Sequence, residues 1–228
     1  LLDYEKYCIS TFDKTLFVNK EEMNYFEEPY KTVWMPNGVN EQLLSYDKTN
    51  EKYGSWVVFF GKMDYQPNID AILWFINNVL PLLNVNLKFA IVGANPAACI
   101  KKIKGRYSNV VVTGFVEDPY EILKSSLCIV APMQTGAGIQ NKVLESMALG
   151  TINIVSSLSA KPINAQDKRD LLIIDDPSEM AKVINDIFIN PDKYRYIKMN
   201  SREFIKSHFT WGIYENKLLR LIEEVTRT

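Results

Sequence analysis

Residues 135–150 read TGAGIQNKVLESMALG and follow an apolar run, residues 127–131, that is typical of a buried strand. This pattern predicts a strand, a glycine turn and a helix that ends at Gly150. Backbone N–H groups point outward at such a helix N-terminus, and the helix dipole there favours negative charge. Lys142 adds a cation, and Glu145 adds a carboxylate one turn further along. The stretch therefore predicts a phosphate site beside a hydroxyl-binding carboxylate, which suits a nucleotide-activated sugar.

The same order of strand, glycine and helix recurs on both sides of this stretch. Apolar runs predict strands at 56–60, 88–92, 109–113, 127–131, 151–156 and 171–174, and helical spacing predicts helices at 69–80, 97–103, 119–125, 139–149 and 179–189. The short links between them predict an α/β fold with a doubly wound parallel sheet. Gly61, Gly93, Gly114, Gly136 and Gly138 each follow a predicted strand. Because ligands bind beyond the carboxyl ends of such strands, we expect these turns to line one crevice.

The two ends of the chain lie outside this alternation. Short strands are predicted at 14–19 and 31–35, a helix capped by Asn19 at 20–26, and two last helices at 192–207 and 212–225. We therefore divide the chain into the tail of another domain (1–40), a polar linker (41–54), a Rossmann-like domain (55–207) and a C-terminal helix (208–228). Because Leu1 is not a natural start and helical spacing begins at once, we expect a fragment of a longer protein.

Composition narrows the class of protein. The chain has 228 residues, of which 47% are hydrophobic, so it can bury a sizeable core. Its net charge of −1 provides no basic field for nucleic acid. No apolar run reaches the roughly 18 residues that a bilayer span needs. The three cysteines lack metal-ligand spacing, and Cys128 reads as a buried reduced thiol, which fits a cytoplasmic setting. We expect no nucleic-acid partner, no transmembrane segment and no metal site.

Isolated polar residues have structural interpretations. We expect Asp64 to cap the 69–80 helix or its loop, and Ser178 to cap the helix that follows it. Asp175 and Asp176 favour a turn over a metal site, and His208 favours a structural role over catalysis.

Several motifs together resemble the C-terminal donor-binding domain of family 4 retaining glycosyltransferases. They are LESMALG at 144–150, GKMD at 61–64 with QPN at 66–68, VG at 92–93, TGFV at 113–116, PNGV at 36–39 and FTW at 209–211. The resemblance covers most of the chain from Phe12 onward. It implies one half of a two-domain architecture called GT-B, with a remnant of the other half. It also implies transfer of a sugar from a nucleoside diphosphate donor to a hydroxyl acceptor, with no metal and no cofactor.

The resemblance also implies partners and a place in the cell. The acceptor is a glycan or a lipid-linked acceptor, and its binding groups are expected outside this chain, so the fragment alone is expected to be inactive. Bacterial polysaccharide or glycan synthesis is the implied process. The implied location is cytoplasmic, at the inner face of the membrane if the missing N-terminal domain makes peripheral contact with it.

The same resemblance assigns the four parts of the donor to four groups of residues. The diphosphate is assigned to Gly61, Lys62, Gly138, Ile139, Gln140, Asn141 and Lys142. Glu145 is assigned to the ribose, Gly114, Phe115 and Val116 to the base, and Gly136 and Ala137 to the transferred sugar. From the residues themselves, Phe115 has two interpretations, stacking at the base or packing in the core.

The chain departs from the family pattern at three positions. Ala137 stands where the family often has a second glutamate, Pro67 where it has a cation, and Lys62 where it more often has an arginine. We hypothesise that Lys142 supplies the missing cation; the alternative is a surface lysine. For Lys62 the alternative is a lysine that only ends a strand.

Two other functions stay open. A nucleotide-sugar epimerase can share the GT-B fold, but it needs acid–base groups near the sugar, and Ala137 and the single histidine argue against it. A non-catalytic nucleotide-sugar binding module is the other. A dinucleotide-dependent oxidoreductase is disfavoured because no Gly-x-Gly-x-x-Gly follows the first strand.

Overall fold

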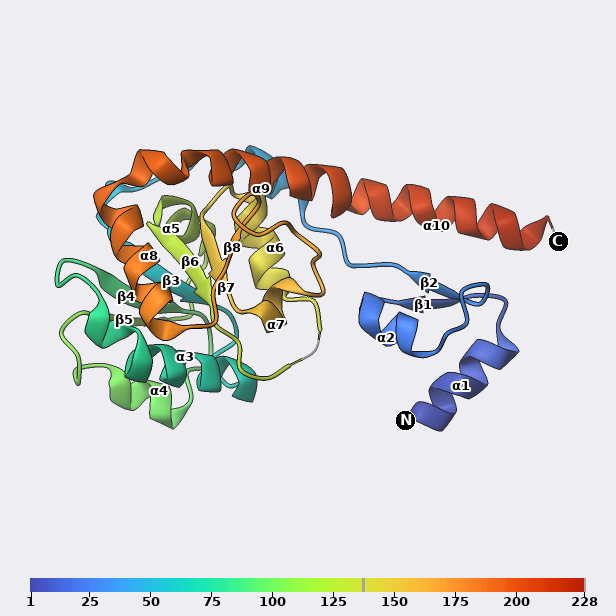
Figure 1. The fold of residues 1–228 in the computed structure, drawn as a ribbon, viewed down its shortest axis with the longest axis horizontal. Helices are drawn as coiled ribbons and strands as arrows, with labels where there is room; N and C mark the ends of the chain where they lie inside the picture. The colour runs from blue at the N-terminus through green and yellow to red at the C-terminus, as the bar shows by residue number, and fades with distance from the viewer. Residues whose placement is uncertain (137, 228) are drawn as a thin grey trace.

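A six-stranded parallel sheet forms the centre of the larger unit in the computed structural model, which describes residues 1–136 and 138–227 (Figure 1). Its order is β5-β4-β3-β6-β7-β8. The strands are β3 (Trp56–Phe60), β4 (Lys88–Val92), β5 (Val110–Gly114), β6 (Cys128–Ala131), β7 (Asn153–Val155) and β8 (Leu172–Ile173). The predicted doubly wound sheet is confirmed. Chain order reverses between β3 and β6, which is where such sheets bind ligands.

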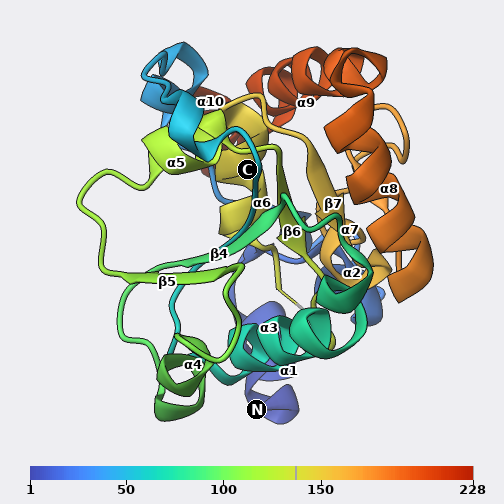
Figure 2. The same cartoon turned by 90° about the vertical axis from the view of Figure 1, so that its left-hand side faces the viewer.

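The sheet is buried on both faces, and neighbouring residues of its strands face opposite ways and so belong to different apolar clusters. In β3, Val57 and Phe59 belong to one apolar cluster, and Val58 belongs to the other. The first cluster lies under α3 (Gln66–Asn78), α4 (Ala98–Ile103) and α8 (Pro177–Ile189). The second lies under α5 (Tyr120–Ser125), α6 (Asn141–Ala148) and α9 (Arg195–His208). Figure 2 shows the two helical layers on either side of the strands.

Helix boundaries differ from the predictions in places. α6 begins at Asn141, two residues later than expected, so Ile139 and Gln140 belong to the preceding loop. A short helix, α7 (Ser157–Ala160), was not predicted, and 3-10 turns cover Leu80–Leu82 and Pro191–Tyr194. The cap of α8 is Asp176, whose side chain accepts from the Glu179 N–H at 2.8 Å, so the prediction of Ser178 was wrong. Pro177 at the first helical position favours this earlier start.

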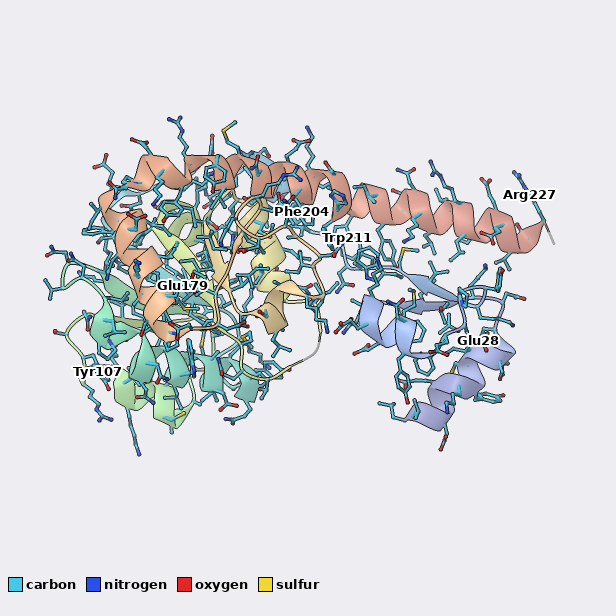
Figure 3. The ribbon with its side chains drawn as sticks, in the orientation of Figure 1. Glu28, Tyr107, Glu179, Phe204, Trp211 and Arg227 are labelled. Atoms are coloured by element: carbon cyan, nitrogen blue, oxygen red, sulfur yellow. The ribbon has the colours of Figure 1, made fainter. Side chains whose placement is uncertain are left out.

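The N-terminal residues form a small separate unit beside the sheet domain (Figure 1). It contains α1 (Leu2–Thr11), β1 (Thr15–Phe17), α2 (Lys20–Tyr25) and β2 (Thr32–Trp34), and β1 and β2 pair in parallel. The long last helix, α10 (Trp211–Thr226), runs from the sheet domain along this unit. Lys14 pairs with Glu224 at 3.0 Å, and Lys217 donates to the Trp34 carbonyl. Trp211 lies where the two units meet (Figure 3).

The polar segment between the two units is folded onto the sheet domain. It forms 3-10 turns at Glu41–Ser45 and Glu51–Tyr53. Leu43 is buried in the second apolar cluster, and Tyr46 Oη donates to Asp118 Oδ2 at 2.9 Å. Within the described residues, no helix combines the length and apolar composition that a bilayer span requires.

Other polar residues have local partners. Asp64 pairs with Lys62 at 3.6 Å in the loop before α3, whose N-cap is Tyr65 without a side-chain bond, so of the two predicted roles the helix cap was wrong. Asp175 accepts from the Ser157 N–H at 2.8 Å, and Asp176 caps α8, so both lie in the link between β8 and α8 and not in the predicted turn. His208 Nδ1 lies 2.8 Å from the Phe204 carbonyl, one turn earlier on α9. Cys128 is buried, and burial raises its pKa to about 12.

Candidate functional site

The turns after β3 and β4 are fixed against each other by two glycines. Gly61 and Gly93 have φ angles of 150° and 153°. A Cβ on Gly93 would lie 1.7 Å from the Gly61 carbonyl oxygen, so only glycine permits this approach. The Met63 N–H also donates to the Ala94 carbonyl at 3.0 Å. The turn that carries Lys62 is therefore held in place by backbone contacts.

The loop after β6 lies against the same region. Gly136 has a φ of 104°, and a Cβ there would be 3.9 Å from Pro67 at the start of α3. The loop then leads into α6 at Asn141. The predicted sugar-proximal residue Ala137 lies outside the described residues. At the reversal point of the sheet, the turn after β3 and the loop after β6 therefore lie side by side.

Lys142 sits inside this junction. Its side chain is buried, with 9% of the residue exposed, so the alternative of a surface lysine is wrong. Its Nζ donates to Asn68 Oδ1 at 2.6 Å and to Met133 Sδ at 3.3 Å, and it lies 4.2 Å from the centre of the Phe59 ring. These neighbours come from α3, the loop after β6, and β3. Burial lowers the pKa of Lys142 to about 7.

Lys62 has the opposite surroundings. Its side chain is exposed and forms an ion pair with the exposed Asp64. Its backbone carbonyl accepts from Asn68 Nδ2 at 2.8 Å. Asn68 is itself buried, and it connects the Lys62 turn to the Lys142 ammonium through its two amide atoms.

Glu145 lies one turn further along α6 and is half-buried. Tyr120 Oη donates to its Oε2 at 3.4 Å. Burial raises the pKa of Glu145, and burial together with the neighbouring Glu145 carboxylate raises the pKa of Tyr120 to about 12. The Tyr120 ring is placed by edge contacts with Phe60 at 6.5 Å and Tyr46 at 6.2 Å between ring centres. The carboxylate is thus oriented by an aromatic cluster and can accept hydroxyl protons.

The segment after β5 leads to this tyrosine. Gly114 has a φ of 71° with open space around it. Phe115 is 78% exposed, so its core interpretation is wrong. Val116 packs against the second apolar cluster. An exposed aromatic ring at a strand end is available to stack on a planar ligand.

The structure brings part of the predicted site together. Gly61, Lys142 and the loop with Gly136 meet at the reversal point, whereas Lys62 points to solvent. Gly138 and Asn141 are exposed, and Ile139 and Gln140 are half-exposed. In the ranges that the structure describes, no three His, Cys, Asp or Glu side chains are grouped to hold a metal.

Three residues of the site had no predicted role. They are Asn68, Met133 and Tyr120, which contact Lys142 or Glu145. Asn68 belongs to a motif noted in the sequence, but its hydrogen bond to Lys142 joins residues 74 positions apart, and no local pattern indicates such a partner.

Residues 54–190 match the protein family described as Glycosyl transferases group 1. A protein of Klebsiella pneumoniae, described as an uncharacterized 44.6 kDa protein in the cps region, is 24% identical over 211 residues. The matched part is 88% of this chain and 53% of that protein. The chain thus spans about half the length of the curated relative that it matches.

Solved structures share the fold at low identity. A glycosyltransferase from Rickettsia africae has a TM-score of 0.79 at 14% identity, over 99% of this chain and 68% of its own. Alr3699/HepE from Anabaena, solved with UDP, has a TM-score of 0.78 at 12% identity, over 93% and 64%. Sucrose-phosphate synthase from Thermosynechococcus elongatus has a TM-score of 0.76 at 19% identity, over 99% and 61%.

Proposed function

The chain belongs to the group 1 glycosyltransferase family, and from this premise we propose that it holds a nucleoside diphosphate sugar for transfer of the sugar to a hydroxyl acceptor. One observation supports this most directly. The reversal point of the sheet combines two glycine turns, the start of α6 with Lys142, and a half-buried carboxylate oriented by Tyr120. A diphosphate suits the first two, and a ribose suits the third.

Each part of the donor has its own residues in this proposal. Gly61, Lys62 and residues 138–142 hold the diphosphate, and Glu145 holds the ribose hydroxyls. Gly114, Phe115 and Val116 lie at the base, and Gly136 and Ala137 at the sugar. A cation at the diphosphate stabilises the leaving group as the sugar departs, which is often the largest catalytic contribution. Family 4 membership, retention of configuration and independence of metal complete the proposal.

We propose that this chain is part of a longer protein. The curated relative is about twice as long as the part that matches, and its name places it in a cps region. We therefore propose a role in polysaccharide or glycan synthesis on the cytoplasmic side, with a glycan or lipid-linked acceptor. Residues 1–40 are assigned to the acceptor domain, 41–54 to the linker, 55–207 to the donor domain, and 208–228 to a helix that returns toward the acceptor domain. The 228 residues alone are expected to bind nucleotide without turnover.

Calorimetric titration with UDP, GDP, ADP and their sugars tests the proposal. At least one of these ligands should bind the wild-type chain. Glu145→Ala should weaken its binding about tenfold or more, because a charged acceptor of two hydroxyl protons is lost. The control is Glu51→Ala. Glu51 is an exposed carboxylate that precedes β3, so it lies toward the amino ends of the strands, away from the candidate site. Absence of binding for all six ligands, or equal losses in both variants, contradicts the proposal.

A further inference from the structure

The Lys142 ammonium has only uncharged neighbours among the interactions described above. Its hydrogen-bond acceptors are an amide oxygen and a thioether sulfur, and its third neighbour is the Phe59 ring. A buried cation is costly unless an anion is near, because it has lost most of its hydration. The protein thus keeps a buried ammonium at the reversal point without a carboxylate bonded to it.

The charged groups on the surrounding elements are engaged elsewhere. On the turn after β3, Lys62 and Asp64 pair with each other. On α3, Asp70 accepts from Gln66 at 2.7 Å. On α6, Glu145 accepts from Tyr120. The described residues of the loop after β6, 132–136, contain no ionisable side chain.

Asn68 is placed to orient this ammonium relative to the turn after β3. Its Oδ1 accepts from Lys142 at 2.6 Å, and its Nδ2 donates to the Lys62 carbonyl at 2.8 Å. A Cβ on Gly61 would lie 3.0 Å from that Nδ2 and 3.7 Å from Lys142 Cδ. Lys142 therefore lies directly beneath the turn. An amide can make both contacts at once, and it adds no charge.

We propose that Asn68 is the positioning residue of the donor site, and that the donor's diphosphate supplies the counter-charge that Lys142 lacks, so that donor binding takes up one proton from solvent above neutral pH. This inference rests on the proposed function. An aspartate at position 68 would be a permanent counter-charge for the Lys142 ammonium. The uncharged asparagine leaves that role to a ligand.

Linkage gives the direction of the effect. The free protein loses the Lys142 proton at a pKa of about 7, because the ammonium is buried. A bound diphosphate favours the charged form and raises this pKa. Between the two pKa values the complex binds more protons than the free protein, so donor affinity falls as pH rises, by at most about tenfold per unit.

The test is calorimetric titration of the 228-residue chain with UDP-glucose, GDP-mannose and ADP-glucose between about pH 7 and about pH 9. Nucleotide sugars are used because a terminal phosphate titrates near pH 6 and would add its own pH dependence. Two buffers of different ionisation enthalpy report the proton taken up. For the nucleotide sugar that binds, the wild-type affinity should fall across this range with uptake of up to one proton.

Three variants separate charge from geometry. Lys142→Met keeps an apolar stem over Phe59; it should bind about a hundredfold more weakly and without pH dependence. Asn68→Asp should bind about tenfold or more weakly, also without pH dependence, because its carboxylate keeps Lys142 charged and occupied. Asn68→Leu loses the amide without adding charge, so it should bind several-fold more weakly but keep the pH dependence.

The outcomes distinguish failure of the proposed function from failure of the proton uptake at Lys142. If the wild type binds none of the three nucleotide sugars, the proposed function fails, and this inference fails with it. If it binds with an affinity that does not change with pH, or if Lys142→Met keeps the wild-type pH dependence, only this inference fails. If Asn68→Asp does not fold by circular dichroism, the comparison of wild type with Lys142→Met still decides the proton uptake.

Discussion

The turn after β3 and the start of α6 each bring a lysine to the reversal point of the sheet, and the surroundings of these lysines are opposite. Lys62 is exposed and already paired with Asp64, whereas Lys142 is buried against a neutral amide. An exposed ion pair contributes little because water and salt screen it. A buried cation interacts strongly with an anion that reaches it. We therefore expect Lys142 to dominate diphosphate binding, although Lys62 holds the position that the family pattern marks.

The largest effect is expected from a substitution that disrupts the contact between the turns after β3 and β4. Gly93→Ala places a methyl group 1.7 Å from the Gly61 carbonyl, so it should lower the free energy of unfolding by more than about 3 kcal/mol. Gly105→Ala is the matched control. It has a φ of 89° but no atom within 4 Å, so only the backbone strain of about 1 kcal/mol is expected. Urea denaturation measures both, and similar losses would show that the turns can separate without cost.

The next effect is the pH dependence that the buried Lys142 gives to the free energy of unfolding. The unfolded chain keeps the Lys142 proton up to its ordinary pKa of 10.5, but the folded protein loses it near 7. The unfolded state therefore binds more protons between these values, and this group makes stability rise with pH there. The stability of wild type minus that of Lys142→Met should rise by at most about 1.4 kcal/mol per pH unit above neutrality. Chemical denaturation at several pH values measures it; a flat difference contradicts a buried, titrating Lys142.

A smaller effect is expected at the exposed lysine. Lys62→Met should weaken nucleotide-sugar binding only about two- to five-fold, because its ammonium is hydrated and its partner Asp64 competes with the ligand. The loss should shrink further at high salt. Titration of Lys62→Met beside Lys142→Met makes the comparison direct. A loss at Lys62 that equals or exceeds the loss at Lys142 would reverse our interpretation of the two regions.

The smallest effect tests whether nucleotide binding by Glu145 depends on the hydrogen bond that Tyr120 donates to it. Tyr120→Phe removes one hydrogen bond of 3.4 Å to Glu145 and keeps the ring contacts with Phe60 and Tyr46. Such a long bond contributes little, so we expect nucleotide affinity to fall about two- to three-fold. Titration with the same nucleotide sugar measures it. A loss as large as that of Glu145→Ala would mean that Tyr120 itself contacts the donor.

Local patterns were enough to predict the sheet. The buried run at 56–60 and the similar runs after it predicted every strand of the large sheet, because strands covered on both faces are mostly apolar. Boundaries that depend on single side chains were less predictable. Asp176 and Ser178 are both good helix caps, and the choice between them depended on Pro177. Asp64 also looked like a cap, but the structure pairs it with Lys62.

The sequence by itself determined the doubly wound sheet, the glycine turns at its strand ends, and the positions of Lys142 and Glu145 near the start of one helix. These follow from residue periodicity and from backbone conformations that glycine favours, which are local properties. Only the tertiary structure decided that Lys62 faces solvent, that Phe115 is exposed, and that Lys142 is buried on Asn68. Burial and hydrogen-bond partners depend on segments far apart in the chain. The charge state of a lysine follows from those surroundings and not from its position in a motif.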